Sequence, residues 1–521
     1  MHLNRLSLFI IIVFVLPIFA LLSSAFFPYG DNLYHIYDTV LYDYFFNSLS
    51  LAIGVAFITF LLGGSTAFLT SMYNFPLRRL ITVMLILPLA IPPYINAITY
   101  SGILENYSAI DIHNLFGSVL MISFVVYPYV YLLARGAFIE QSREIYENSQ
   151  VLGVTNAKMF FKVSLPLARP AIILGVTLSA MEALADYGTV EFLGVATFTT
   201  GIFRTWIGMG DTISAAQMAT FFLTIVFIFV LIEQNTRRKI KYAESTKHRR
   251  KFNRISVPKH IGFIFLIICL IPLLFGFLIP FFQLLFWAFF KSDVFSKNEL
   301  WDITFNSLSL ATIGSVIIVL ISLLFTYSQR LNPTLFLNRM LKVMTMGYAI
   351  PGPVIAIAVL VPFSYLDGFL NNISNNYFNF DIGLIFSGTF FVLIFAYCLR
   401  FSTISIRSLT DGFGKINYSI DETARLMGIS ERKILKSLHI PLLGTPLLTS
   451  FLIVFVDIMK ELPLTSVLRP FNFNTLSVKA FELASDELII DASGASIMIV
   501  FAGIIPIIFI MKNIYGKRNL L

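Results

Sequence analysis

The sequence predicts an all-α polytopic membrane protein made of two six-span helical units, and three observations lead to this class. The first is composition, because 57% of the 521 residues are hydrophobic, 13% are charged and the mean hydropathy is +0.82. No soluble chain of this length has such values. The second is a series of apolar runs long enough to cross a bilayer core about 30 Å thick. The third is an internal repeat that divides the chain in two.

Twelve apolar runs, six on each side of a basic linker, are candidate spans. Both cysteines, Cys269 and Cys398, lie inside such runs, so the sequence offers neither a disulfide framework nor a thiolate metal cluster. The runs cover roughly residues 7–27, 48–72, 80–101, 117–133, 171–188 and 216–232 in the first half, and 261–290, 307–327, 340–362, 382–399, 442–460 and 495–511 in the second.

The first run also has features of a signal peptide. Arg5 precedes an apolar stretch that ends in small residues at Ser23, Ser24 and Ala25. We favour a retained span, because the second half has a matching run and the apolar stretch exceeds the usual length of a signal sequence. Cleavage would leave the rest of the topology unchanged.

The distribution of Lys and Arg predicts the orientation, since these residues are retained on the cytoplasmic side. If the N-terminus is inside, all but six of the 37 Lys and Arg residues fall in cytoplasmic segments. This asymmetry predicts an even number of spans with both termini cytoplasmic, and it explains the pI of about 9.2 without a nucleic-acid partner. The basic run at 247–254 is therefore interpreted as a topogenic, lipid-facing stretch.

The internal repeat extends over most of the chain. The segment NSLSLA at 47–52 returns at 306–311, and Ile91-Pro92 returns as Ile350-Pro351, each 259 residues later. Further along, the displacement is 275, so we expect a 16-residue insertion that includes the Asn-rich segment NNISNNYFNF. Two copies of a six-span unit point the same way and imply a pseudo-two-fold axis along the membrane normal. The predicted domains are a first unit at 1–233, a basic cytoplasmic linker at 234–260 and a second unit at 261–521.

Two hydrophilic loops, one in each half, also repeat each other. In the second, at 420–443, Ser419 and Glu422 have the spacing of a capping box, and Gly428 suits a left-handed helix end. Ser430 is placed to cap a following helix. Each loop is thus predicted to form a helix, a glycine turn and a second helix that leads to a proline.

Apolar residues stand among the charges of both loops. Exposed apolar residues on the cytoplasmic side predict a docking partner, once per half. These residues are Val151, Leu152, Met159, Phe160 and Phe161 in the first loop, and Leu426, Met427, Ile429 and Leu435 in the second.

Both loops resemble the cytoplasmic coupling motif of ABC importer permeases, in which Glu-Ala-Ala is followed by a Gly and an apolar-Pro pair. The first copy reads Glu-Asn-Ser and departs from the motif, whereas the second reads Glu-Thr-Ala. The matching positions are Glu147, Gly153, Leu165 and Pro166 in the first loop, and Glu422, Gly428, Ile440 and Pro441 in the second.

The resemblance implies partners that the chain itself does not contain. One ATPase subunit would dock on each loop, making two copies, and a binding protein would deliver the substrate on the outer side. The sequence has no GxxxxGK[ST] phosphate loop, so ATP would be hydrolysed by another chain. We therefore expect neither an enzymatic activity nor a cofactor in this chain, and a multi-pass location in the bacterial inner membrane.

Two acidic pairs are candidates for a substrate path. Glu182 and Asp186 stand four apart and are predicted to share one helical face, and Asp457 and Glu461 repeat them 275 residues later. Intramembrane carboxylates are costly and usually functional, and clustered oxygen ligands suit a hard cation. The alternative is that the pairs lie near the outer surface as ordinary ion pairs, with Lys460 neutralising one of them. Metal ligation is left open.

The segments around these acids, EALADYGTVEFLGVATFTTGIFRTW and MKELPLTSVLRPFNFNTLSVKAFE, resemble fused permeases of ferric-iron importers. Within them, Phe198-Thr199-Thr200 and Phe473-Asn474-Thr475 keep the 275-residue register and are predicted to be paired elements. Thiamine and phosphonate importers have similar permeases, so these substrates are alternatives. A twelve-span carrier independent of ATP is a further alternative, although its basic signature is not matched by the short segment NFPLRRL.

Overall fold

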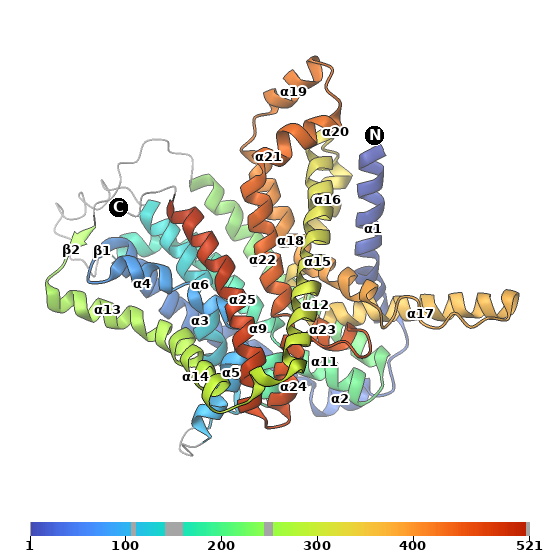
Figure 1. Ribbon diagram of the computed structural model, residues 1–521, viewed down its shortest axis with the longest axis horizontal. Coiled ribbons are helices and arrows are strands. Elements are labelled where there is room, and N and C mark those ends of the chain that lie inside the picture. The colour runs from blue at the N-terminus through green and yellow to red at the C-terminus, as the bar shows by residue number, and fades with distance from the viewer. Residues whose placement is uncertain (1, 106–110, 141–159, 244–253, 517–521) are drawn as a thin grey trace.

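The computed structural model describes all residues except 1, 106–110, 141–159, 244–253 and 517–521 (Figure 1). In this part of the chain the secondary structure is helical, apart from one pair of two-residue strands. Strand β1 (Tyr73–Asn74) pairs in parallel with β2 (Ile255–Ser256). The predicted all-α class is therefore confirmed.

The first half contains one long helix for each predicted span except the run 80–101, together with several short connecting helices. Its helices are α1 (His2–Ser23), η1 (Ser24–Phe26), α2 (Leu33–Thr39), α3 (Leu41–Met72), α4 (Arg78–Met84), η2 (Leu87–Ala90), α5 (Pro93–Leu104), α6 (Leu115–Glu140), η3 (Phe160–Ser164), α9 (Leu165–Ala185), α10 (Gly188–Phe192), α11 (Phe198–Phe203), η4 (Arg204–Gly208) and α12 (Thr212–Ala243).

The second half repeats this order. Its helices are α13 (Lys259–Leu273), η5 (Leu274–Leu278), α14 (Ile279–Phe290), η6 (Val294–Ser296), α15 (Asn298–Leu331), α16 (Leu335–Met344), η7 (Gly347–Ala349), α17 (Gly352–Phe378), α18 (Phe390–Gly414), α19 (Tyr418–Leu426), α20 (Glu431–Ile434), η8 (Leu435–His439), α21 (Ile440–Leu442), α22 (Gly444–Met459), α23 (Pro463–Leu468), α24 (Leu476–Ser485) and α25 (Ile489–Gly516).

Ten helices in the described residues are long and apolar enough to cross a membrane, or up to 12 if each of two bent pairs is one span. The predicted run 80–101 is one of these pairs, bent by 92° between Ala90 and Pro93. The two adjacent prolines there remove backbone donors, so a straight helix is not possible. The predicted run 382–399 was also placed too early, because α18 begins at Phe390.

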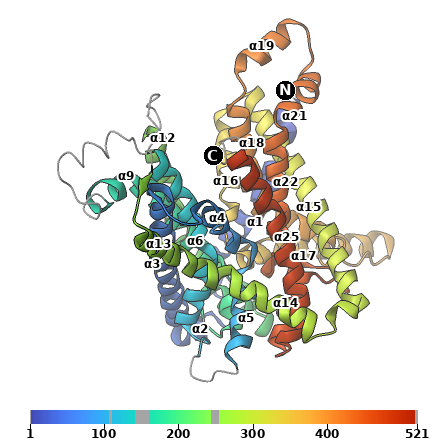
Figure 2. The same ribbon diagram turned by 60° about the vertical axis from the view of Figure 1, so that its left-hand side comes forward.

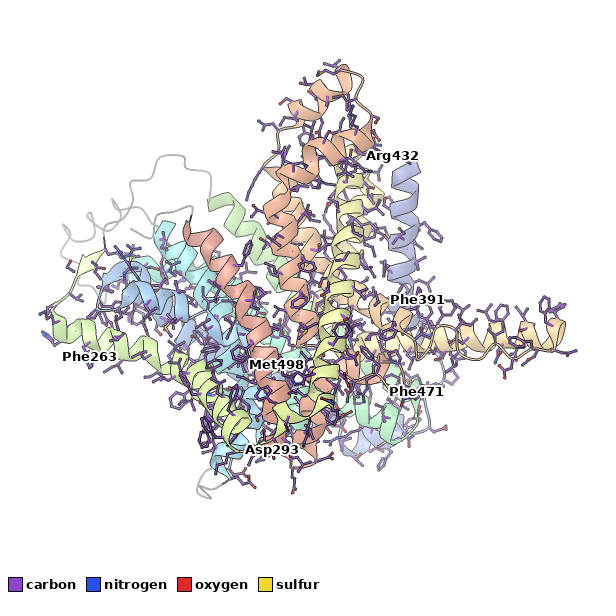
Figure 3. The ribbon with its side chains drawn as sticks, in the orientation of Figure 1. Phe263, Asp293, Phe391, Arg432, Phe471 and Met498 are labelled. Atoms are coloured by element: carbon purple, nitrogen blue, oxygen red, sulfur yellow. The ribbon has the colours of Figure 1, made fainter. Side chains whose placement is uncertain are left out.

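Each half forms its own helical bundle. Helices α3, α6 and α9 pack together in the first half, and α15, α18 and α22 do so in the second. Small residues allow close approach within a bundle, since a Cβ on Gly63 would lie 2.8 Å from the carbonyl oxygen of Tyr127. Large apolar side chains such as Phe263 and Phe391 cover the outer surfaces (Figure 3), as expected of helices that face lipid.

The first helix of each half packs against the other half. Helix α1 contacts α15, α16 and α17 of the second half, and Phe14 stacks on Phe395 with a centroid distance of 4.6 Å. Conversely, α13 and α14 contact α3, α4 and α5 of the first half (Figure 2). Tyr100 donates a hydrogen bond of 2.9 Å to the carbonyl oxygen of Phe275 across this contact. The two halves are therefore interlocked at two places.

Helix α17 is longer than its counterpart in the first half. Helix α5 ends at Leu104, whereas α17 continues to Phe378 and projects sideways from the body (Figure 1). The predicted Asn-rich insertion forms the end of this projection and the turn after it.

Candidate functional site

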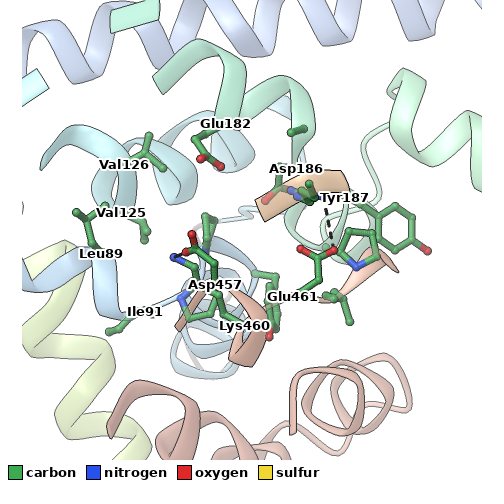
Figure 4. A pocket seen from close by; sticks show the side chains of 18 of the residues that line it. Leu89, Ile91, Val125, Val126, Glu182, Asp186, Tyr187, Asp457, Lys460 and Glu461 are labelled. Carbon is green, nitrogen blue, oxygen red and sulfur yellow. Dashed lines mark ion pairs between the residues drawn. The ribbon is translucent and has the colours of Figure 1, made fainter. Parts of the chain in front are cut away.

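A cavity of about 120 Å³ lies at the seam between the two halves (Figure 4), and we call it the central cavity. The first half lines it with parts of η2, α5, α6, α9 and α10, and the second half with parts of η7, α18 and α22 and the start of α23. All four acids singled out in the sequence line this cavity. They are Glu182, Asp186, Asp457 and Glu461.

The acids of the central cavity are partly shielded from solvent. Asp457 is 9% exposed and Glu461 is 6% exposed, while Glu182 and Asp186 are half-buried. The pairing considered in the alternative prediction does exist, because Lys460 Nζ lies 2.9 Å from Asp457 Oδ1. It lies inside the cavity, however, where water does not screen the charges as it would at a surface.

The prediction that each acidic pair shares one helical face is wrong, because a helix break separates its members. Helix α9 ends at Ala185, and the Asp186 carboxylate accepts hydrogen bonds from the backbone N–H groups of Thr189 (2.9 Å) and Val190 (3.3 Å). Asp186 therefore caps the next helix, α10. Its side chain still reaches the cavity because the break turns the chain toward the seam.

The second half repeats this arrangement. Helix α22 ends at Met459, and Glu461 Oε1 accepts a hydrogen bond of 3.0 Å from the backbone N–H of Leu464 at the start of α23. Two hydroxyls support the breaks from a distance in sequence. Thr199 donates to the carbonyl oxygen of Asp186 at 2.8 Å, and Ser477 donates to that of Glu461 at 2.7 Å.

Two of the acids also contact side chains of other helices. Glu182 Oε1 accepts a hydrogen bond from Tyr348 at 2.5 Å and a weaker one from Tyr129 at 3.4 Å. Tyr129 belongs to the first half and Tyr348 to the second, so Glu182 links the halves. Glu461 lies 3.5 Å from Arg400 Nη1, and this contact lacks the geometry of a hydrogen bond.

The central cavity therefore holds four acidic and two basic side chains. It also offers donors that make no hydrogen bond to any described residue, namely the hydroxyl of Tyr94 and the Nε and Nη1 atoms of Arg400. No group of three or more His, Cys, Asp and Glu side chains in the described residues is placed to hold a metal ion.

Sequence reasoning missed Tyr94, Tyr129, Tyr348 and Arg400. Arg400 was detectable, because it interrupts the apolar run FAYCLRFSTIS, and a charge within a span is costly. The three tyrosines gave no signal, since tyrosine is common in the spans of this chain.

The second coupling loop, predicted at 420–443, forms a helix, a glycine turn and a second helix as predicted, although the first helix begins earlier, at Tyr418. Gly428 has φ +73° and ends α19 in the left-handed conformation, as predicted. Ser430 precedes α20, but its side chain makes no capping hydrogen bond. The predicted capping box is wrong, because α19 begins at Tyr418 and Ser419 lies inside it.

Two of the four apolar residues predicted to be exposed in this loop face outward, whereas Ile429 and Leu435 are half-buried and Leu435 packs against the core. Leu426 is 90% exposed and Met427 is 73% exposed, at the end of the molecule where α19 stands clear of the bundle (Figure 1). Glu422 is exposed beside them. The loop therefore presents an apolar surface with charges around it.

A buried ion pair holds the second coupling loop to the bundle. Arg330 Nε, at the end of α15, lies 2.7 Å from Asp421 Oδ2, and His439 Nε2 lies 2.7 Å from Asp421 Oδ1. Arg330 also donates to the carbonyl oxygens of Phe413 (2.8 Å) and Ile416 (3.0 Å). We call Arg330, Asp421 and His439 the loop anchor. Burial disfavours the charged form of Asp421, but these hydrogen bonds outweigh it and hold its pKa below the ordinary 3.8.

The first coupling loop is described only at its end. Glu147 and Gly153 lie outside the described residues, as do Val151, Leu152 and Met159. Leu165 begins α9 with Pro166 in its first turn, and Ile440 likewise begins α21 with Pro441. At the positions equivalent to the loop anchor, the first half carries Ser71, Tyr146 and Ser164.

The predicted pairing of Phe198 with Phe473 is wrong by three residues. Helix α11 begins at Phe198, whose N–H donates to Ser48 at 3.0 Å, and α24 begins at Leu476, whose N–H donates to Ser307 at 2.8 Å. The equivalent residues are therefore 278 apart. The chain gains three residues between α23 and α24, a shift too small to recognise among repeated Phe and Thr residues.

Two interlocked helical bundles around a charged cavity define a membrane permease made of two fused units. The chain belongs to the family described as binding-protein-dependent transport system inner membrane component, which matches it twice, at 59–242 and 331–518. The two matches cover corresponding parts of the two halves. They leave out α1, α13 and α14, the helices that cross between halves, as well as the first part of α3 and nearly all of α15. The protein is thus a permease of an ABC importer, and the family implies ATPase and substrate-binding partners.

Curated relatives agree with this class. The Fe(3+)-transport system permease protein FbpB 2 of Haemophilus influenzae is 24% identical over 89% of each chain. The probable sulfate transport system permease protein cysT of Chlorokybus atmophyticus is 26% identical over 35% of this chain and 68% of its own. The molybdate/tungstate transport system permease protein WtpB of Pyrococcus abyssi is 24% identical over 36% and 73%.

Replacing Asp421 with Asn should loosen the second coupling loop. Asn keeps the size of the side chain but leaves Arg330 with an unpaired buried charge, which typically costs about 3–5 kcal/mol. We expect trypsin to cleave after Arg425 or Lys433 at least about tenfold faster in the variant, because local opening costs less free energy. The exposed Asp411→Asn on α18 is the matched control and should cleave at the wild-type rate.

The stabilisation of the second coupling loop by Asp421 should decrease as pH falls. Because the folded pKa of Asp421 lies below its ordinary value, its stabilisation is complete at neutral pH and is lost as pH falls through the folded pKa. The difference in amide hydrogen-exchange protection of the loop between wild type and Asp421→Asn, measured in place of tryptic cleavage at acid pH, should therefore shrink below about pH 4. A difference that stays constant down to pH 3 would show that the carboxylate charge is not what holds the loop.

Proposed function

We propose that this chain forms the translocation path of an ABC importer for ferric iron. The observation that carries the proposal is the convergence of four carboxylates from both halves in one buried cavity at the seam. The likeness to the Fe(3+)-transport permease supports it, because that relative matches along nearly the whole two-half layout. The proposed path residues are Glu182, Asp186, Asp457 and Glu461.

The partners of the acids suit a site that is occupied only in passing. When no substrate is present, Lys460 and Arg400 balance part of the negative charge of Asp457 and Glu461, which would otherwise be costly to bury. A trivalent cation competes with these side chains for the carboxylate oxygens, the ligands that hard cations prefer. Weak contacts at several sites allow the ion to leave again, as conduction requires.

The tyrosines at Glu182 are placed to close the seam. Tyr129 and Tyr348 come from different halves and meet at one carboxylate oxygen. When the halves tilt apart, at least one of these hydrogen bonds breaks, so the carboxylate becomes available to substrate as the cavity opens. The cavity therefore opens and the Glu182 carboxylate becomes accessible in the same step.

Coupling to ATP is assigned to the two loops. We propose that one ATPase subunit docks on each, at Glu147, Gly153, Leu165 and Pro166 and at Glu422, Gly428, Ile440 and Pro441, and that this chain has no enzymatic activity of its own. The units at 1–233 and 261–521 and the linker at 234–260 are the proposed division of the chain. Both termini and the linker are placed on the cytoplasmic side with the ATPases. A substrate-binding protein delivers the ion at the opposite end.

An oxyanion is a second candidate substrate. The Nε and Nη1 atoms of Arg400 and the hydroxyl of Tyr94, which make no hydrogen bond to any described residue, are donors suited to an anion, and Lys460 adds charge. Relatives named as sulfate and molybdate/tungstate permeases match about a third of the chain. The excess of carboxylates over cationic groups favours a cation.

Removing two of the carboxylate charges distinguishes the two substrates. The double variant Asp186→Asn with Glu461→Gln keeps size and capping ability but lowers the negative charge of the central cavity. Ferric-iron uptake into vesicles with the partner ATPases should fall at least about tenfold, because a cation loses Coulomb stabilisation. Sulfate uptake, if it occurs, should be unchanged or faster.

A matched control removes two charges away from the cavity. Asp38→Asn with Asp302→Asn changes exposed positions and should keep wild-type uptake. Co-purification of the ATPases should be the same for all variants. Wild-type iron flux in a fully assembled Asp186→Asn, Glu461→Gln transporter would remove these residues from the path.

Charge reversal on the second coupling loop tests the docking assignment. Glu422→Lys keeps the helix former but places a like charge among Arg425 and Lys433, so docking of a complementary surface weakens. ATP hydrolysis stimulated by substrate should be lost while membrane insertion is retained. Glu105→Lys, at the other end of the bundle, is the control. Equal coupled activity in both variants would refute docking at this loop.

A further inference from the structure

The projecting part of α17 and the chain that follows it form a structure with no counterpart among the described residues of the first half. We call residues 363–389 the lateral hairpin. Helix α17 passes the end of α1 that is remote from the N-terminus and projects sideways, and the second view shows the same projection (Figures 1 and 2). Residues 379–389 return along it to the start of α18.

The lateral hairpin satisfies its own polar groups. Asp367 is 1% exposed, and its carboxylate accepts backbone N–H groups of the returning chain, including those of Phe386 at 3.0 Å and Ser387 at 2.7 Å. Asn371 accepts from the N–H of Ile382 at 2.8 Å. Asn379 adopts the left-handed conformation at the turn. The polar side of α17 is thus occupied by the return segment, and the helix needs no other protein element there.

The other side of the projecting helix is apolar and exposed. Tyr365, Phe369 and Tyr377 are 75%, 61% and 80% exposed, and Leu366 and Ile373 stand between them at helical spacing. Asn372 and Asn375 form an exposed polar strip next to this face. Figure 3 shows side chains standing out from this helix without a neighbouring element. The projection is an amphipathic helix with an aromatic face.

The position of this face relative to α1 indicates what covers it. Ile18 and Leu21 of α1 line one small apolar pocket with Val354 and Ala358 of α17, so the base of α17 lies at the end of α1. The apolar run of α1 ends there at Phe26, which is 90% exposed, and Phe27 and Tyr29 follow it as exposed aromatics. Aromatic side chains gather where spans meet the membrane–water interface.

Charge complementarity with a protein partner is absent. The sequence has no Lys or Arg between Lys342 and Arg400, and in the hairpin only Asp381 carries an exposed charge. The outer surfaces of the neighbouring spans are apolar in the same way, for example at Phe390 and Phe391 of α18. The aromatic face therefore continues the lipid-facing surface of the bundle.

We propose that the lateral hairpin lies in the membrane interface at the end of the spans remote from the coupling loops. Its aromatic face rests on the acyl chains, and its Asn strip faces the headgroups and water. This is the arrangement of interfacial amphipathic helices. Because only the second half has the extension, lipid holds the two halves unequally. The proposal does not depend on the transported substrate.

Depth-dependent fluorescence quenching tests this placement. In full-length protein whose native Trp206, Trp287 and Trp301 are replaced by Phe, a single tryptophan is introduced as Phe369→Trp. The matched control on the polar strip is Asn375→Trp. Both variants are reconstituted in phosphatidylcholine vesicles brominated either near the glycerol end or near the methyl end of the acyl chains, and are also titrated with iodide.

We expect Phe369→Trp to be quenched at least twofold more strongly by bromine near the glycerol end than by bromine near the methyl end, and to resist iodide. Asn375→Trp should be quenched weakly by bromine at either position and strongly by iodide. Tyr377→Trp provides a second reporter if Phe369→Trp does not assemble with the ATPases.

Three outcomes would overturn the proposal. Iodide quenching of both positions without lipid quenching would place the hairpin in water. Strongest quenching of Phe369→Trp by bromine near the methyl end would make α17 a membrane span. Protection of Phe369→Trp from iodide only after the substrate-binding protein is added would make the face a protein docking surface.

Discussion

Charged side chains held out of water at the seam between the two halves are the constraint on which the rest of the structure depends. A carboxylate or ammonium group in such a place is costly unless it is paired or hydrogen-bonded. The helix breaks after α9 and α22 supply backbone N–H groups to Asp186 and Glu461, and the crossing helices α1 and α13 keep the halves together around them. The crossing helices thus keep the two halves in contact, and the helix breaks supply the hydrogen bonds that the acids between the halves require.

The two halves share a backbone plan but not the same charges. Glu182 is held by two phenols, whereas its equivalent Asp457 is held by Lys460. An ion pair near the breaks is inverted between the halves, since Glu191 pairs with Arg204 in one and Arg469 with Glu482 in the other, at positions 278 apart. The loop anchor exists only in the second half by sequence. A symmetric scaffold therefore carries an asymmetric path and unequal loops.

The internal repeat made the large features predictable from sequence, because residues that recur at a constant displacement can be assigned to equivalent positions in the two halves. The two units, the acids of the central cavity and the left-handed Gly428 followed from it. Contacts between residues distant in sequence could not be predicted from the repeat. Tyr348 donates a hydrogen bond to Glu182 although the two residues are 166 apart in sequence. Asp186 lies outside α9 because its carboxylate caps the following helix, α10. The sideways course of α17 depends on Asp367 binding a return segment that has no copy in the first half.

Thiol labelling of Glu182→Cys tests most directly whether the central cavity is the path. The native Cys269 and Cys398 are buried, so background labelling is low. In the complex with its ATPases, a charged thiol reagent should reach Cys at this position from one side without nucleotide and from the opposite side with a non-hydrolysable ATP analogue, and ferric iron should slow both reactions. Labelling at one rate in both nucleotide states, or none in either, would contradict the account.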